Sequence, residues 1–231
     1  MSAPPSVFRK RVLPATAAAA AVAVLAGGTW YLFDTASSQP IRHVLFAGDV
    51  QKLARADLEA FAQSVQGAPA GGASLAAVRE AARRIPWVRD ATVRRTFPDA
   101  VEVTFETHRA LARWADGALV SERGEVFSAE HEGNLPLFSG PEGSAAAMAR
   151  EYPAIARAVA PLQASVAEVA LSPRGAWQVV LDSGLVLQLG RGDIHPRLAR
   201  FVAAWPVVAA QDADTKHADL RYANGFALRR K

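Results

Sequence analysis

The chain has 231 residues, of which 51% are hydrophobic and 21% are charged, a globular composition that excludes a mainly disordered chain. It contains no cysteine, which excludes disulfides, thiol catalysis, iron–sulfur clusters and cysteine-type zinc sites. The net charge is +4, but six of the positively charged residues lie in two short clusters, at 9–11 and 229–231. The excess of positive charge therefore belongs to these clusters, and the sequence predicts no basic face that would bind nucleic acid.

The first predicted element is a transmembrane helix over residues 12–33. These 22 residues carry no charge and would form a helix of about 33 Å, enough to cross a hydrocarbon core of ~30 Å. The basic cluster before the run and Asp34 after it predict a cytoplasmic tail at 1–11 and an exported remainder. A cleaved signal peptide is the alternative, because the run is rich in alanine. Membrane-anchoring side chains are expected at Leu13, Leu25, Trp30, Tyr31 and Phe33.

A small α+β domain is predicted over residues 41–106, after a linker at 34–40. A strand at 41–50 precedes two helices, the second of which Ser74 could cap. The helices are indicated by apolar residues at helical spacing, namely Leu58, Phe61, Val65 and then Leu75, Val78, Ala82, Ile85. Two further strands, at 87–95 and 101–106, are joined by a turn at 97–99, and the second alternates apolar and polar residues. The predicted order is therefore β-α-α-β-β.

A second domain, mostly antiparallel sheet with packed helices, is predicted over residues 107–231. Hairpin patterns occur at 111–120 and 178–189. Amphipathic helices are expected after Ser144 and from Asp193 onward. The last predicted strand covers 219–222 and could run on to Leu228.

The residues form no recognisable catalytic or metal-binding pattern. No two histidines have the i, i+4 spacing of a helical zinc site, and neither a Gly-x-Ser-x-Gly turn nor a phosphate-binding loop of the Walker type is present. Catalytic groups can assemble from distant residues, so this pattern does not exclude an enzyme. It favours a binding or scaffolding protein with no cofactor, metal site or small-molecule substrate.

Short motifs follow one another in a specific order through the exported part. They are Ile85-Pro86-Trp87-Val88, Ala91-x-Val93-x-Arg95, Phe97-Pro98, Glu106-x-x-x-Ala110-x-Ala112-x-Trp114, Leu189-Gly190-Arg191-Gly192 and Asp219-Leu220-Arg221-Tyr222-x-x-Gly225. Behind a membrane anchor, these motifs resemble the FtsQ/DivIB family of bacterial cell-division proteins. Within this resemblance, residues 41–106 are similar to a POTRA domain of the FtsQ type.

The resemblance implies a non-catalytic scaffold of the divisome, anchored by a single type II span in the cell inner membrane at the division septum. Its partners would be FtsB, coiled with FtsL, captured by pairing with the last strand, and other division proteins at the POTRA-like domain and the membrane span. The partner-binding positions that it implies are Arg174, Arg221, Tyr222, Asn224 and Gly225. Arg230 replaces a tryptophan that is common in the family, which affects the far end of the contact.

Two other functions remain open at this point. A membrane-anchored periplasmic enzyme acting on the cell wall would gather His, Asp or Ser side chains in one pocket. A POTRA-bearing chaperone or secretion component would bind many extended peptides and would normally carry several POTRA modules, of which one is visible here.

Overall fold

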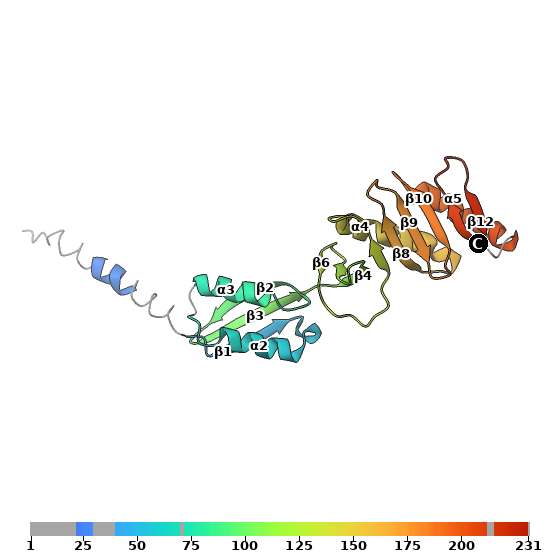
Figure 1. Ribbon diagram of the computed structural model, residues 1–231. Coiled ribbons are helices and arrows are strands. Elements are labelled where there is room, and N and C mark those ends of the chain that lie inside the picture. The colour runs from blue at the N-terminus through green and yellow to red at the C-terminus, as the bar shows by residue number, and fades with distance from the viewer. Residues whose placement is uncertain (1–21, 30–39, 70–71, 212–214, 231) are drawn as a thin grey trace, which may run out of the picture. The chain divides into compact units, whose positions relative to one another are not determined.

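The computed structural model describes residues 22–29, 40–69, 72–211 and 215–230, which form two compact units (Figure 1). The first unit comprises the described residues up to Val50, together with Ala54–Arg83 and Asp90–Phe105. The second comprises Gln51–Leu53, Arg84–Arg89 and the described residues from Glu106 onward.

The predicted membrane span lies largely outside the described residues. A helix covers residues 22–29 and includes Leu25, whereas Leu13, Trp30, Tyr31 and Phe33 lie outside the described ranges. Within those ranges, no helix is both long enough and apolar enough to cross a membrane.

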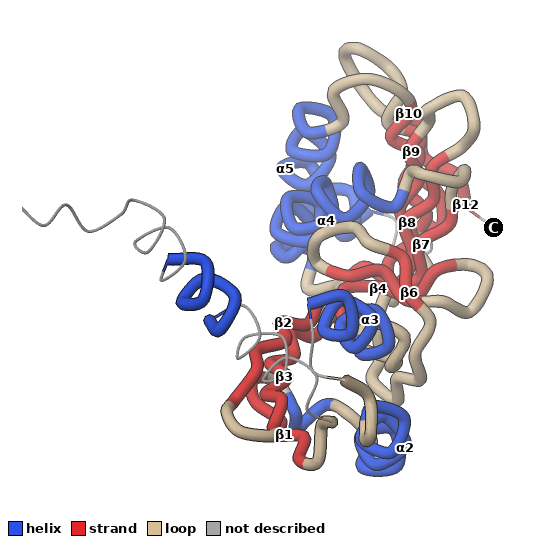
Figure 2. Tube along the Cα trace, turned by 90° about the vertical axis from the view of Figure 1, so that its left-hand side faces the viewer, coloured by secondary structure: helices blue, strands red, loops and turns tan. Residues whose placement is uncertain are grey.

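The first unit has the predicted β-α-α-β-β order. Its elements are β1 (His43–Gly48), α2 (Arg55–Val65), α3 (Gly72–Ala82), β2 (Val88–Thr96) and β3 (Ala100–Thr107), although the first residues of β2 and the last of β3 belong to the second unit, as does most of the 3-10 turn at Val50–Lys52. The strands form a sheet of order β1-β3-β2 in which β1 runs parallel to β3, and both helices lie to one side of it in Figure 2. The sheet and helices meet through the rings of Phe46, Phe61 and Phe105, whose centroids are 5.8–6.2 Å apart.

Two local details of this unit differ from the prediction. The first strand ends at Gly48 rather than at 50, because Gly48 takes a positive φ of 81° that turns the chain off the sheet. Ser74 lies inside α3, which already begins at Gly72, so it is not the capping residue. The predicted buried positions Phe61, Val65, Val78, Ala82 and Ile85 are confirmed.

The second unit is built on one nine-stranded sheet of order β12-β11-β10-β9-β8-β7-β4-β5-β6. Adjacent strands are antiparallel except for the pairs β10–β11, β7–β8 and β4–β7, which are parallel. The strands are β4 (Ala110–Trp114), β5 (Leu119–Ser121), β6 (Val126–Phe127), β7 (Leu137–Ser139), β8 (Val166–Leu171), β9 (Trp177–Leu181), β10 (Val186–Gly190), β11 (Thr215–Asp219) and β12 (Ala227–Arg230).

Helices α4 (Ala145–Val159) and α5 (His195–Gln211) cover one face of this sheet, and no helix of the described residues covers the other, open face (Figure 2). The covered face carries fully buried side chains from neighbouring strands, among them Phe138, Val169, Val179 and Leu187. The helices add Met148, Ile155, Leu198 and Phe201 to the same core, with a 3-10 turn at Ala160–Leu162 after α4. Ser144 stands at the N-cap of α4 as predicted, but its hydroxyl donates to the Pro141 carbonyl at 2.6 Å rather than capping the helix.

Candidate functional site

The chain passes from β11 to β12 through a loop, not through the continuous strand that the sequence predicted over 219–222 and toward Leu228. Strand β11 ends at Asp219, and β12 begins at Ala227. The Asp219 carboxylate accepts a hydrogen bond from the backbone N–H of Arg221 at 3.1 Å, a side-chain turn that replaces a strand bond. The predicted contact residues Arg221, Tyr222, Asn224 and Gly225 are therefore loop residues.

The Arg221 side chain is fixed in place by Asp219. Its Nε and Nη2 atoms donate to Oδ1 and Oδ2 of that carboxylate at 2.8 and 2.6 Å. The methylene stem crosses Gly190, where an added Cβ would lie 2.9 Å from Arg221 Cγ. A guanidinium has five N–H donors, so several remain for a ligand while its orientation is already set.

This ion pair changes the titration of Asp219. The hydrogen bond from the Arg221 side chain lowers the pKa of the Asp219 carboxyl; partial burial opposes this, and the Arg221 backbone N–H adds to it. The same hydrogen bond raises the pKa of the Arg221 guanidinium above its ordinary value. The pair is therefore fully ionised at neutral pH.

We expect a corresponding pH dependence of the loop. The folded-state pKa of Asp219 lies below the unfolded value of about 3.9, so its stabilising contribution is complete above that value and disappears as the pH falls through the folded-state pKa. Carbon-detected NMR of the carboxyl should give a midpoint below about 3.9 in the native chain and near the ordinary value in Arg221→Gln. An unshifted native midpoint would contradict the ion pair.

The loop between β11 and β12 is held against α5. Arg200, on that helix, donates to the carbonyls of Tyr222 at 3.1 Å and of Ala223. Phe226 packs edge-on against Phe201 with ring centroids 5.3 Å apart. The Tyr222 side chain stays 56% exposed, so a large aromatic surface is presented on a loop that is anchored at both ends.

Strand β12 is the end strand of the sheet. It pairs with β11 on one side, and the described part of the chain places no strand on its other side. All four of its residues are exposed. An exposed edge of this kind presents backbone groups to which another polypeptide can add a strand.

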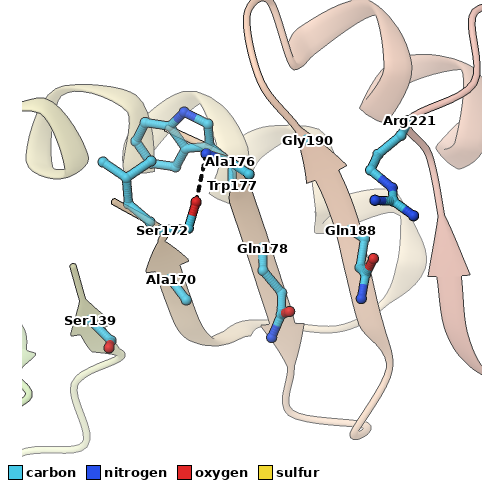
Figure 3. Close-up of a pocket in the computed structure, with 10 residues that line it drawn as sticks. Ser139, Ala170, Ser172, Ala176, Trp177, Gln178, Gln188, Gly190 and Arg221 are labelled. Atoms are coloured by element: carbon cyan, nitrogen blue, oxygen red, sulfur yellow. Dashed lines mark hydrogen bonds between the residues drawn. The ribbon is translucent and has the colours of Figure 1, made fainter. Parts of the chain in front are cut away.

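A groove crosses the open face of the sheet from β7 to β10, and Arg221 of the loop before β12 lines it as well (Figure 3). Strand register places its residues in one row, in which Ala170 is paired with Ser139 and Gln178, and Gln188 with Gln178 and Asp219. The groove has a volume of about 360 Å³ and ends at Arg221. Its lining residues include Ser139 and Ser172 but no histidine or carboxylate, so they offer hydrogen bonds rather than a nucleophile with a base.

Arg174 lies in a turn at one edge of the same groove. It lies in the turn between β8 and β9, where Gly175 donates to the Ser172 carbonyl at 2.8 Å and the Ala176 N–H donates to the Ser172 hydroxyl at 3.0 Å. Ser172 and Ala176 line the groove that ends at Arg221. The turn that carries Arg174 and the loop that carries Arg221 therefore border the same groove.

Several residues of this site were not predicted from the sequence. Asp219 and Arg200 position the loop, and Gln178 and Gln188 line the groove. Of these residues, only Asp219 could have been recognised from the sequence, because an Asp side chain often accepts a hydrogen bond from the backbone N–H two residues later and so forms a turn. In the described part of the chain, no three His, Cys, Asp or Glu residues are grouped so as to hold a metal ion.

Comparisons with known proteins match both units. Residues 39–106 match the family described as POTRA domain, FtsQ-type, and residues 112–221 match Cell division protein FtsQ/DivIB, C-terminal. The cell division protein FtsQ of Burkholderia pseudomallei is 46% identical, over 65% of this chain and 64% of its own length. That of Nitrosospira multiformis is 40% identical over 67% and 66%, and that of Shewanella oneidensis 31% identical over 84% and 76%. The first two matches thus span a little under two thirds of the relatives.

Proposed function

The chain belongs to the FtsQ/DivIB family of cell division proteins, and from this premise we propose that it is a non-catalytic scaffold that assembles the divisome. Its mechanism is capture of FtsB, coiled with FtsL, through a strand added to the edge of β12. The observation that carries the proposal is the exposed end strand β12, which directly follows the anchored loop at Tyr222.

Strand addition divides affinity and specificity between different groups. Backbone hydrogen bonds along β12 supply affinity that depends little on the partner's sequence. Specificity then comes from side chains at the end of the sheet, where Arg221 is oriented by Asp219 and Tyr222 is exposed. Arg174, on the neighbouring turn, would pair with a carboxylate of the partner, an interaction that a guanidinium can make through two parallel hydrogen bonds.

Arg230 occupies the position where the family often has a tryptophan. In this chain it is the last residue of β12, next to Arg229. The far end of the contact would therefore rest on positive charge instead of an aromatic ring, and charge acts mainly on the rate of encounter with an acidic partner.

The proposed topology places the scaffold in the cell inner membrane as a single-pass type II protein at the division septum. Residues 1–11 form the cytoplasmic tail, 12–33 the span and 34–40 a linker, with the domains 41–106 and 107–231 in the periplasm. The POTRA domain and the span contact other division proteins, so the chain connects partners at the membrane with those captured at β12.

Tyr222→Ala tests the site directly. We expect it to weaken binding of the full-length chain, in detergent micelles, to FtsB coiled with FtsL by about 10- to 100-fold, because exposed interface tyrosines are common hot spots of about 2 kcal/mol. Isothermal titration calorimetry measures the affinity, and circular dichroism checks the fold. Phe97→Ala is the matched control, since it removes an exposed ring, 81% accessible, from the first unit. If a folded Tyr222→Ala chain binds with native affinity, the loop at Tyr222 is not part of the binding site.

A further inference from the structure

A second pocket lies within the second unit, of about 450 Å³, and is lined by Lys52, Trp87, Arg109, Ala110 and His131. Ala110 begins β4, which lies toward the β6 end of the nine-stranded sheet, whereas β12 forms the opposite end. The pocket therefore cannot be part of the contact proposed at β12.

Two aromatic rings form one wall of this pocket. Trp87 lies 5.8 Å from the ring of His131 and packs edge-on against Phe127 at 5.4 Å. Phe127 in turn stacks on His108 at 4.2 Å. The indole is thus held by a layer of rings and still lines the cavity, which makes it a rigid apolar surface for a ligand.

The backbone of Trp87 is also unusual. Its φ is +72°, a left-handed conformation that is uncommon and energetically unfavourable for a bulky side chain. The conformation is supported by a hydrogen bond from the His108 N–H to the Trp87 carbonyl at 2.8 Å. Backbone strain of this type clusters at ligand sites, because the surrounding structure keeps a side chain where an unstrained backbone would not.

Two cations lie at the same pocket. Lys52 and Arg109 are both exposed, and neither has a carboxylate within 4.0 Å among the described residues. Nearby Arg113, by contrast, is occupied, since it donates to the carbonyls of His131 at 2.8 Å and of Gly133 at 3.3 Å. The pocket thus combines an apolar aromatic wall with two positive charges that the described chain does not neutralise.

We propose that this pocket binds an acidic segment of a partner polypeptide, with a carboxylate between Lys52 and Arg109 and an adjacent apolar side chain against Trp87. Charge complementarity sets the sign of the ligand. The open setting favours a polypeptide over a small molecule, because small-molecule sites bury most of the ligand surface, whereas Lys52 and Arg109 are exposed to solvent. The chain then has two protein contacts, at opposite ends of one sheet.

Gly133 leaves room for the His131 ring. A Cβ at this position would lie 2.3 Å from His131 Nε2, so Gly133→Ala must displace the ring from the aromatic wall. This variant changes the shape of the pocket while leaving both cations in the chain.

The probe is the peptide acetyl-Glu-Leu-Glu-Leu-amide, titrated into the full-length chain in zwitterionic micelles. Its binding is followed by the indole N–H NMR signal of Trp87, assigned with Trp87→Phe. We expect a saturable shift of that signal, at least tenfold weaker binding in Lys52→Gln and Arg109→Gln, and weaker binding in Gly133→Ala. Arg174→Gln is the matched control, since it removes an exposed cation at the site proposed for FtsB and should leave the titration unchanged.

Three results would overturn the proposal. One is a Trp87 signal that does not respond to the acidic peptide. Another is an equal response to acetyl-Gln-Leu-Gln-Leu-amide, which would make charge irrelevant. The third is an equal response to glutarate alone, which would define a small-anion site. None of these results bears on capture at β12, which is measured with a different partner and different variants.

Discussion

Phe201→Ala is expected to lower the free energy of unfolding of the second unit by about 3–5 kcal/mol, the usual loss when a large core ring is removed. Phe201 is fully buried on α5 and contacts two further rings, those of Trp205 and Phe226, each with a centroid distance of 5.3 Å. Urea denaturation followed by tryptophan fluorescence should show the change as a lower transition midpoint with an unchanged slope.

The same substitution should reach the candidate site as well. Phe226 immediately precedes β12, and its ring packs against Phe201, so the cavity would release the start of that strand. We therefore expect weaker capture of FtsB even at urea concentrations where the chain stays folded. Phe97→Ala is the control here too, because substitution of an exposed ring normally changes stability by less than about 0.5 kcal/mol. A loss below about 1 kcal/mol in Phe201→Ala would mean that the core can close around the missing ring.

The first unit could be predicted from the sequence because its signals are local. Phe61 and Val65 repeat at helical spacing, and Val101, Val103 and Phe105 alternate with polar residues along a strand. Each pattern requires only a few neighbouring residues to decide the element, so the β-α-α-β-β order was confirmed. The errors were at boundaries, such as Gly48 and Ser74, where one residue's conformation decides.

The order of the second sheet could not be predicted in the same way. Its hairpins, such as β9–β10, were visible as turns between apolar runs. The parallel pairs β4–β7 and β10–β11 join segments that are far apart in the sequence, and a helix or another strand intervenes. Which strands pair in this way depends on which faces are buried together. This is a property of the whole core, and the hydrophobic periodicity of single segments does not encode it.

The candidate site also combines features that the sequence predicted with features that it could not predict. Arg221 and Tyr222 were predicted as contact residues through a family resemblance, but their placement on a strand was wrong, because the Asp219 side chain competes for the backbone N–H that a strand would use. The row formed by Ala170, Gln178 and Gln188 exists only through strand register. The left-handed backbone of Trp87 had no signal in the sequence at all.

Proline in β12 should have the largest effect on partner capture. Leu228 pairs with Ala218 and Arg229 with His217, so these are consecutive positions of one antiparallel ladder. In such a ladder, backbone N–H groups of successive residues point to opposite sides. One of the two N–H groups therefore faces β11, and the other faces the open edge where a partner strand would add.

Leu228→Pro and Arg229→Pro together form an internally controlled pair. The substitution at the outward N–H removes one hydrogen bond to the partner and leaves the partner's acceptor unpaired, about 2–4 kcal/mol in total, or roughly 30- to 1000-fold in affinity. The substitution at the inward N–H weakens the β11–β12 pair instead, so amide hydrogen exchange in β11 should accelerate in that variant alone. Capture of FtsB by the folded, full-length chain separates the two. If both variants bind like the native chain, strand addition at β12 is wrong, and the affinity must come from side chains of the Tyr222 loop. If only the outward position matters, backbone pairing is the main source of affinity, and the partner's sequence is free to vary wherever it does not meet Arg174, Arg221 or Tyr222.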